Sequence, residues 1–155
     1  GYWGLAVYGS KSPHNLGTIW RTAHCLGASF VARVGPIRYP ADRIPRDVPP
    51  PKADQTDTMV TLRHVPFLQV ETIEALVQAL PFARLVAVEL DAGSEPLPGF
   101  KHPERAIYLL GAEDGGIPRV VLDRMDAIVQ IPGSHCLNQA VAASIVAYDR
   151  IAKGG

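Results

Sequence analysis

The most informative stretch of this chain reads Ile131-Pro132-Gly133-Ser134-His135-Cys136-Leu137-Asn138 and continues as Gln139-Ala140-Val141-Ala142-Ala143-Ser144-Ile145-Val146-Ala147-Tyr148. A β-branched run ends at Pro-Gly, a pair that interrupts regular structure and favours a turn. A short polar loop follows, and then an alanine-rich segment typical of a helix that neighbours approach closely. The pattern predicts a strand, a loop that holds a ligand, and a helix.

Two further loops of this kind occur earlier in the chain. One reads Ser12-Pro13-His14-Asn15-Leu16-Gly17-Thr18-Ile19-Trp20-Arg21, and the other reads Leu109-Leu110-Gly111-Ala112-Glu113-Asp114-Gly115-Gly116-Ile117-Pro118. All three loops follow apolar runs that are typical of strands. Because ligands in open α/β sheets bind beyond the carboxyl ends of the strands, we expect the three loops to meet at one edge.

Strand-like and helix-like segments alternate along the chain. The runs at 85–90 and 106–110 are almost continuously apolar, which is typical of strands covered on both faces. The sequence therefore predicts an α/β fold, a parallel sheet flanked by helices. The expected strands are 5–8, 29–34, 85–90, 106–110 and 127–131, and the expected helices are 15–26, 71–80, 120–125 and 137–153.

The first expected helix has one apolar face. Its apolar residues recur at helical spacing, and Gly27 is a natural stop. At 100° per residue, Arg21 lies on the opposite side and is available for function. The apolar positions are Leu16, Ile19, Trp20, Ala23 and Leu26.

Length and composition indicate one globular domain spanning residues 1–155, with no room for a second folded domain. No apolar run approaches the roughly 20 residues that span a bilayer, and no signal peptide is visible. The two cysteines, Cys25 and Cys136, are too few for a disulfide framework or a tetrahedral zinc site. We therefore expect a cytoplasmic protein that makes no membrane contact and binds no metal.

The formal net charge is zero, but the charges are unevenly distributed. Residues 1–63 carry eight Lys and Arg against four Asp and Glu, and five of the arginines fall between positions 21 and 46. Forked guanidinium groups suit phosphate contacts, so Arg21, Arg43 and Arg46 are candidate RNA-binding residues. A solvated loop surface is the alternative explanation, and charge alone does not separate the two.

Other sites are less well supported by the residues. The segment after the first strand lacks the glycine spacing of a dinucleotide site and the Lys-Ser/Thr ending of a phosphate loop. Glu113 and Asp114 could form a metal-binding or acid-base pair. Acids at the start of a helix are more often favoured by the helix dipole, and a metal-dependent hydrolase would lack histidine partners here.

The three loops together resemble the motifs of the SpoU-like (TrmH) RNA 2′-O-methyltransferases of the SPOUT superfamily. The resemblance rests on Asn-x-Gly-x-x-x-Arg from Asn15, Gly-x-Glu-x-Gly-x-x-Pro from Gly111, and Ile-Pro-Gly followed by Leu-Asn-x-x-x-Ala. It covers nearly the whole chain, in the right order, and implies a minimal member without the RNA-binding extension found on many relatives. It implies an α/β trefoil knot near the C-terminus, which periodicity does not show.

The resemblance also implies a cofactor and the residues that hold it. S-adenosylmethionine would lie in the second and third loops, contacted mainly by backbone groups. The implied lining residues are Val88, Gly111, Ile131, Cys136 and Leu137, with Leu109, Leu110 and Pro132 at the margin.

Four residues match the catalytic positions of the family motifs: Asn15, Arg21, Glu113 and Asn138. Arg21 would act as the base or as a cation that polarises the 2′-hydroxyl, and the second role is chemically easier because guanidinium stays protonated. Asn138 is equally suited to cap a helix. Cys136 replaces a serine common among relatives; a nucleophilic role for it would need His135 as base.

We therefore expect an S-adenosylmethionine-dependent RNA 2′-O-methyltransferase that acts as a homodimer, with tRNA, including the wobble nucleotide, preferred over rRNA. The alternative is a catalytically silent RNA- or nucleotide-binding module with the same fold. We expect the dimer to bury Leu16, Ile19, Trp20 and Ala23 of the first helix and the small residues of the last. The latter are Ala140, Ala143, Ser144 and Ala147.

Overall fold

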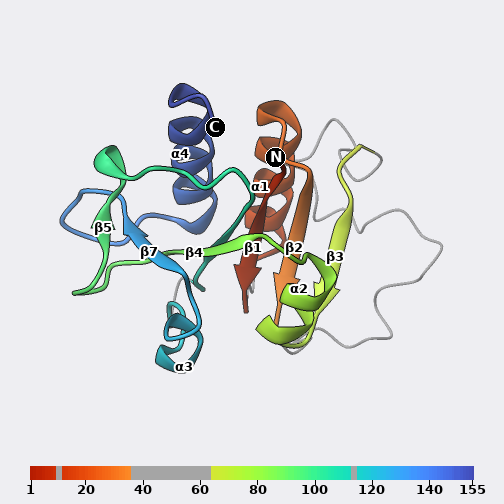
Figure 1. Cartoon of the computed structure of the whole chain (residues 1–155), viewed down its shortest axis with the longest axis horizontal. Coiled ribbons are helices and arrows are strands. Elements are labelled where there is room, and N and C mark those ends of the chain that lie inside the picture. Colours follow the sequence, from red (N-terminus) through yellow and green to blue (C-terminus); the bar gives the residue numbers. More distant parts are fainter. Residues whose placement is uncertain (10–11, 36–63, 113–114) are drawn as a thin grey trace.

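The structure is a computed structural model that describes residues 1–9, 12–35, 64–112 and 115–155. Its centre is a seven-stranded sheet in the order β3-β2-β1-β6-β4-β7-β5, and every pair of neighbouring strands is parallel (Figure 1). The strands are β1 (Trp3–Tyr8), β2 (Phe30–Val34), β3 (Phe67–Val70), β4 (Arg84–Val88), β5 (Glu95–Pro96), β6 (Ala106–Leu110) and β7 (Ala127–Gln130). The predicted parallel α/β sheet is confirmed.

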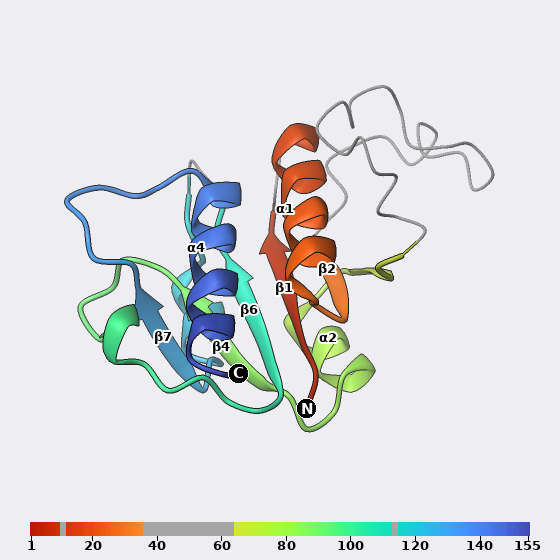
Figure 2. The same cartoon turned by 90° about the horizontal axis from the view of Figure 1, so that it is seen from above.

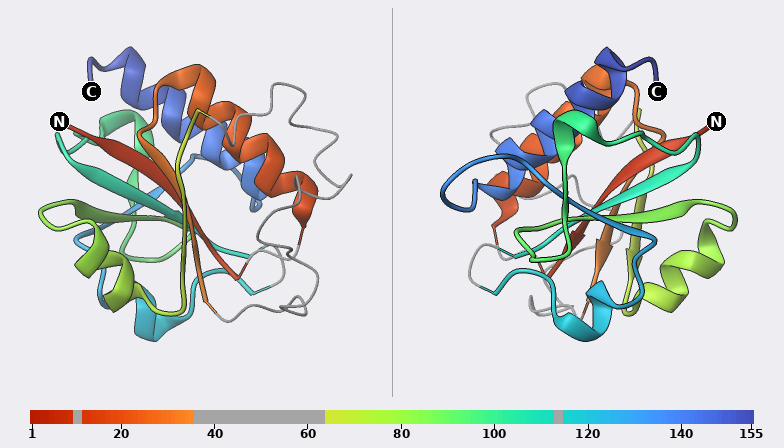
Figure 3. Two further views of the ribbon diagram at one scale, coloured as in Figure 1. Left: turned by 90° about the vertical axis from the view of Figure 1, so that its right-hand side faces the viewer. Right: turned by 60° about the vertical axis from the view of Figure 1, so that its left-hand side comes forward.

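Helices cover both faces of the sheet. The longest two, α1 (Pro13–Leu26) and α4 (Gln139–Ala152), lie on one face, and the short α2 (Ile73–Ala79) and α3 (Arg119–Leu122) lie on the other (Figure 3). A 3₁₀ turn, η4 (Leu97–Gly99), packs on the same face as α4. In the described ranges, no helix has the length and apolar character needed to cross a membrane.

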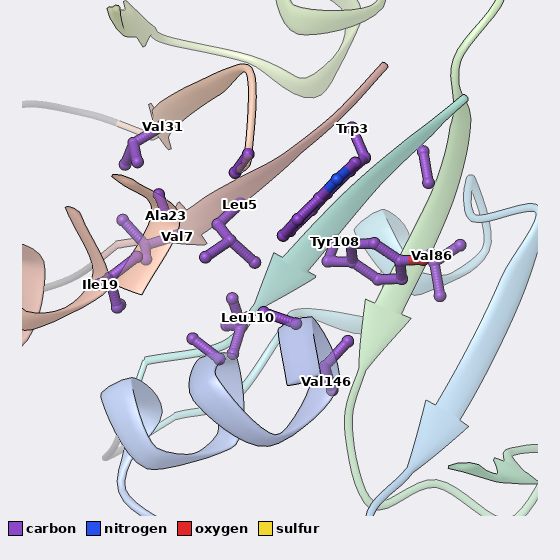
Figure 4. Packing of buried hydrophobic residues seen from close by; sticks show 14 of the residues in the cluster. Trp3, Leu5, Val7, Ile19, Ala23, Val31, Val86, Tyr108, Leu110 and Val146 are labelled. Carbon is purple, nitrogen blue, oxygen red and sulfur yellow. The ribbon is translucent and has the colours of Figure 1, made fainter. Parts of the chain in front are cut away.

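Two hydrophobic clusters form because successive residues of a strand point to opposite faces. Leu5, Val7, Tyr108 and Leu110 pack toward α1 and α4 (Figure 4). The residues that alternate with these in β1 and β6, which are Ala6, Ile107 and Leu109, pack toward α2 and α3. Burial on both faces explains why these strands read as continuous apolar runs.

Helix α1 begins and ends with recognisable caps. The Ser12 hydroxyl accepts a hydrogen bond from the backbone N–H of Asn15 at 3.3 Å. Gly27 ends the helix in the left-handed conformation, with φ of 77°, a geometry that favours glycine. Arg21 is exposed on the outer side, as its spacing predicted.

Helices α1 and α4 lie side by side (Figure 2), and the hydroxyls of Thr22 and Ser144 are 3.0 Å apart between them. The faces that we expected to form a dimer interface are buried inside this chain instead. That expectation was wrong for these residues, because the small side chains of α4 let α1 approach within one subunit. The buried residues are Ile19, Trp20, Ala23, Ala140, Ala143 and Ala147.

A polar network anchors the end of α4 at the edge of the sheet where the strands begin. Arg150, only 2% exposed, donates hydrogen bonds to the carbonyls of Pro103 and Glu104 and to the Tyr108 hydroxyl. The His102 ring bridges the Tyr108 hydroxyl at Nδ1, 2.6 Å, and Asp149 at Nε2, 2.8 Å. The Asp149 carboxylate can only accept, so a neutral His102 ring donates from Nε2 to Asp149, and its Nδ1 accepts from the Tyr108 hydroxyl.

Burial lowers the pKa of His102 below its usual 6.5, although the adjacent Asp149 carboxylate opposes that effect. Burial likewise raises the pKa of Tyr108. The ring and the hydroxyl are therefore both neutral near pH 7, which fits the direction of the hydrogen bonds.

The sequence located every long element but not every short one. It did not predict β3, β5 or η4, each of four residues or fewer. Arg33, counted among the arginines suited to phosphate, is only 5% exposed in β2 and is not on the surface. The C-terminal knot stays a prediction.

Candidate active site

A cavity of about 590 Å³ lies beyond the carboxyl ends of β4, β6 and β7. This volume is in the range of small-molecule sites, and the position is where ligands bind in parallel sheets. Its walls come from three segments: the residues after β4, the glycine loop after β6, and the loop that leads from β7 into α4. The lining residues are 88–91, 110–112, 115–117, 122, 131, 135–139 and 142.

Most of the residues expected to hold a cofactor are brought together here. Val88, Leu110, Gly111 and Ile131 line the cavity, as do Cys136 and Leu137 from the last loop. Two expected residues lie elsewhere. Leu109 is fully buried in the cluster under α2 and α3, since it points to the opposite face from Leu110, and Pro132 is exposed beside the cavity.

Gly111 sits where no side chain fits. A Cβ atom at this position would lie 2.6 Å from the Gly116 carbonyl carbon and 2.8 Å from the Glu89 Oε2 atom. Both distances are shorter than a van der Waals contact, and one of them is to backbone. Glycine is therefore needed at this position so that the loop can pack against Gly116 and Glu89, and Gly111 contributes only main chain to the cavity that it lines.

Glu89 and Gln139 also line the cavity, and the sequence did not indicate either of them. The Glu89 carboxylate accepts hydrogen bonds from the backbone N–H of Ile117 and of Leu90, both at 3.1 Å. Gln139 is buried, and its Nε2 donates to the Gly111 carbonyl at 2.6 Å. The only available signal was position, since Glu89 follows β4 directly and Gln139 opens α4.

Asn138 caps α4 and contacts the first motif as well. Its Oδ1 accepts from the N–H groups of Ala140 at 2.9 Å and Val141 at 3.3 Å, and its Nδ2 donates to Asn15 Oδ1 at 3.3 Å. Since Asn138 also lines the cavity, the first and third motifs meet at its rim. Both uses foreseen for Asn138, as a cap and as part of a polar site, are compatible with this geometry.

The remaining candidates lie farther away or outside the described residues. Arg21 is exposed on α1 and is not among the residues that line the cavity. Glu113, Arg43 and Arg46 fall outside the described ranges. Their roles stay predictions.

Cys136 lines the cavity with its thiol exposed. The neighbouring His135 ring has its Nδ1 2.9 Å from the Ser134 hydroxyl, so its contact is with serine. A nucleophilic role for Cys136 gains no support from this arrangement. Among the described residues, no three His, Cys, Asp or Glu side chains are grouped as metal ligands would be.

Comparison with known proteins gives one consistent result. The model of the SpoU rRNA Methylase family matches residues 4–148. A tRNA (cytidine(34)-2′-O)-methyltransferase of Beijerinckia indica is 34% identical over 151 residues, covering 92% of this chain and 86% of that protein. The 23S rRNA (guanosine-2′-O-)-methyltransferase RlmB of Acinetobacter baylyi is 26% identical, covering 94% of this chain and 57% of that protein.

Solved structures agree with this result. An AdoMet-bound rRNA methyltransferase from Sinorhizobium meliloti superposes with a TM-score of 0.80 at 26% identity, over 97% of this chain and 56% of that one. A structure solved to explain the 2-OH methylation of C/U34 on tRNA gives the same TM-score and identity, over 98% of this chain and 95% of that one. The described fold is thus shared along almost the full length of the chain.

Proposed function

Because this chain belongs to the SpoU rRNA Methylase family, we propose that it transfers the methyl group of S-adenosylmethionine to a ribose 2′-oxygen of RNA. The observation that carries the proposal is the cavity beyond β4, β6 and β7, whose wall at Gly111 is bare backbone. A related rRNA methyltransferase of the same fold has been solved with AdoMet bound.

The residues of the cavity fit this cofactor. Val88, Ile131 and Leu137 offer apolar surface for a purine, and Glu89 and Asp91 add negative charge that favours a cation. When bound, the cofactor supplies an electrophilic methyl group on a sulfonium ion. The proposed reaction therefore requires no metal ion to activate the methyl donor.

The chain's own residues would hold and polarise the acceptor. We assign Arg21 to clamp an RNA phosphate and to lower the cost of negative charge on the 2′-oxygen. Asn15 and Asn138, joined by their side-chain amides, would orient the ribose at the rim. Glu113 would shape the same edge from the glycine loop, and Arg43 and Arg46 would contact phosphates farther along the RNA.

We favour tRNA as the substrate, with the wobble nucleotide of the anticodon loop as the target. The support is the higher identity, 34%, to a tRNA cytidine-34 enzyme than to two 23S rRNA enzymes, 26% and 30%. Ribosomal RNA is the alternative substrate. The proposed compartment, the cytoplasm, follows from the tRNA substrate, and we take residues 1–155 to act as one domain.

We also propose a homodimer, but through a different face from the one that the sequence indicated. Helix α4 and Leu137, two residues before its start, carry a stripe of exposed apolar side chains at helical spacing. Contiguous exposed apolar surface of this kind marks an interaction site. The stripe consists of Leu137 at 46%, Val141 at 48%, Ile145 at 36% and Tyr148 at 68% exposure.

The function is tested by incubating the protein and S-adenosylmethionine with unmodified tRNA, with tRNA already 2′-O-methylated at position 34, and with a 23S rRNA transcript. Nucleoside mass spectrometry should detect an increase in 2′-O-methyl nucleoside, relative to the same incubation without S-adenosylmethionine, in the first RNA alone. Methylation of the rRNA alone would replace the tRNA assignment. Binding of S-adenosylhomocysteine without methylation of any RNA would favour the silent binding module.

A further inference from the structure

The glycine loop, residues 111–112 and 115–117, is a tight turn closed by its own backbone. The N–H of Gly116 donates to the Ala112 carbonyl at 2.9 Å, and the two residues form an isolated β-bridge. Since this turn forms one wall of the cavity, its position decides where the bare backbone of Gly111 lies. Two side chains from other elements hold the turn in place.

The first is Glu89, at the end of β4. Its Oε2 accepts from the Ile117 N–H at 3.1 Å, and the Gly116 Cα side of the turn is so close that a Cβ there would lie 2.8 Å from the same oxygen. The carboxylate thus fastens the last residue of the turn to the strand that carries Val88. A carboxylate that accepts from a backbone N–H makes a strong hydrogen bond.

The second is Gln139, the first residue of α4, at the other end of the turn. Its amide Nε2 donates to the Gly111 carbonyl at 2.6 Å and lies 3.4 Å from the Leu110 carbonyl. The Gln139 side chain is 4% exposed, and its removal would leave the Gly111 carbonyl without this hydrogen-bond donor. Gln139 therefore ties the turn to the helix that Asn138 caps.

From these contacts we infer that Glu89 and Gln139 are positioning residues for the methyl-transfer reaction: together they fix the glycine loop from opposite sides and set the shape of the cofactor pocket. The inference rests on the proposed function. Each acts through the loop, so their effects on cofactor binding are coupled although they belong to different elements.

Calorimetric titration with S-adenosylhomocysteine tests the inference in four variants of the full chain. Glu89→Ala and Gln139→Leu should each raise Kd about tenfold, the scale of one lost buried hydrogen bond. Glu89→Gln keeps one acceptor oxygen, enough for the N–H of Ile117 but not for that of Leu90 as well, so its loss of affinity should be smaller than that of Glu89→Ala. Two independent effects would raise Kd roughly 100-fold in the double variant. We expect a clearly smaller rise, because loss of either contact alone already lets the loop move.

Kinetics and thermal unfolding separate positioning from mere stability. In both single variants KM for S-adenosylmethionine should rise while kcat at saturating cofactor changes by less than about threefold. Matched controls are Glu74→Ala and Gln78→Leu, two exposed positions on α2, which should change neither Kd nor KM.

Several results would overturn the inference. One is a lowered melting temperature with unchanged Kd, which would make the contacts structural only. Another is an equal loss in Glu89→Gln and Glu89→Ala, which would make the charge rather than the loop contact decisive. Fully multiplicative effects in the double variant would refute the coupling. Failure of the wild-type protein to bind S-adenosylhomocysteine would refute the proposed function itself.

Discussion

Replacing Gly111 by alanine tests whether cofactor binding depends on bare backbone. The added Cβ would lie 2.6 Å from the Gly116 carbonyl carbon and 2.8 Å from both Gly116 Cα and Glu89 Oε2. Backbone atoms cannot rotate away, so the glycine loop must shift. Overpacking of this kind costs about 1–3 kcal/mol. Because the cofactor would then meet a displaced wall, its binding should weaken by the same amount of free energy, which raises Kd roughly 5- to 150-fold. Gly111→Val should bind the cofactor still more weakly.

Isothermal titration with S-adenosylhomocysteine measures this change, and two other glycines provide controls. Gly4→Ala would place a Cβ 2.4 Å from the Phe30 ring in the core, so it should lower the melting temperature by roughly 2–12 °C without changing Kd. Gly99→Ala has no atom within 4 Å of the new Cβ and should change neither property. Wild-type affinity in Gly111→Ala and Gly111→Val would show that the cofactor does not bind at this wall.

Three further predictions concern catalysis, pH and assembly. Arg21→Ala should reduce turnover about 100-fold at unchanged cofactor affinity, and Arg21→Lys should recover part of that loss. The control Arg124→Ala, at another exposed arginine, should keep wild-type turnover. Wild-type turnover in Arg21→Ala would make Arg21 a surface residue without a catalytic role. Burial holds the pKa of His102 in the folded protein below 6.5, so as pH falls through 6.5 the unfolded chain binds more protons than the folded one. The free energy of unfolding, measured in urea, should therefore decrease from pH 7.5 to pH 5.5. His102→Gln should flatten this dependence, and a flat dependence in the wild-type protein would contradict the reasoning. Tyr148→Asp should reduce the sedimentation mass from twice 16.7 kDa to that of one chain, and a wild-type protein that already sediments as a monomer would refute the dimer.

The sequence predicted the elements whose signal is local. Helix α1 shows this well: its apolar spacing placed Ile19 and Trp20 inward and Arg21 outward, and the structure agrees. Short strands such as β3 carry too few residues for a period to emerge. They are held by pairing with a neighbour, which no local pattern records.

The sequence was less informative about what each buried face packs against. The small residues Ala140, Ala143 and Ala147 marked a face suited to close packing, and that much is correct. Periodicity does not distinguish a helix of the same chain from one of a second chain. In the structure α1 fills that role, which leaves a different stripe of α4 exposed.

The site shows the same division. Residues expected from the motifs, such as Gly111 and Ile131, line the cavity, whereas Glu89 and Gln139 were not anticipated. Their contacts span 28 residues of sequence in both cases, from Glu89 to Ile117 and from Gln139 to Gly111. A glutamate after a strand and a glutamine at a helix start are common, so the role of these two residues can be recognised only from their tertiary contacts.

The placement of Arg21 bears on how it acts. Asn15 reaches the rim of the cavity through Asn138, but Arg21 follows it by six residues, about 9 Å along the axis of α1 and well around its circumference. Arg21 is exposed on α1 and is not among the residues that line the cavity. A base must touch the 2′-hydroxyl, whereas a phosphate clamp acts one step along the RNA backbone and works through orientation. Since guanidinium stays protonated at neutral pH, the chemistry favours the clamp.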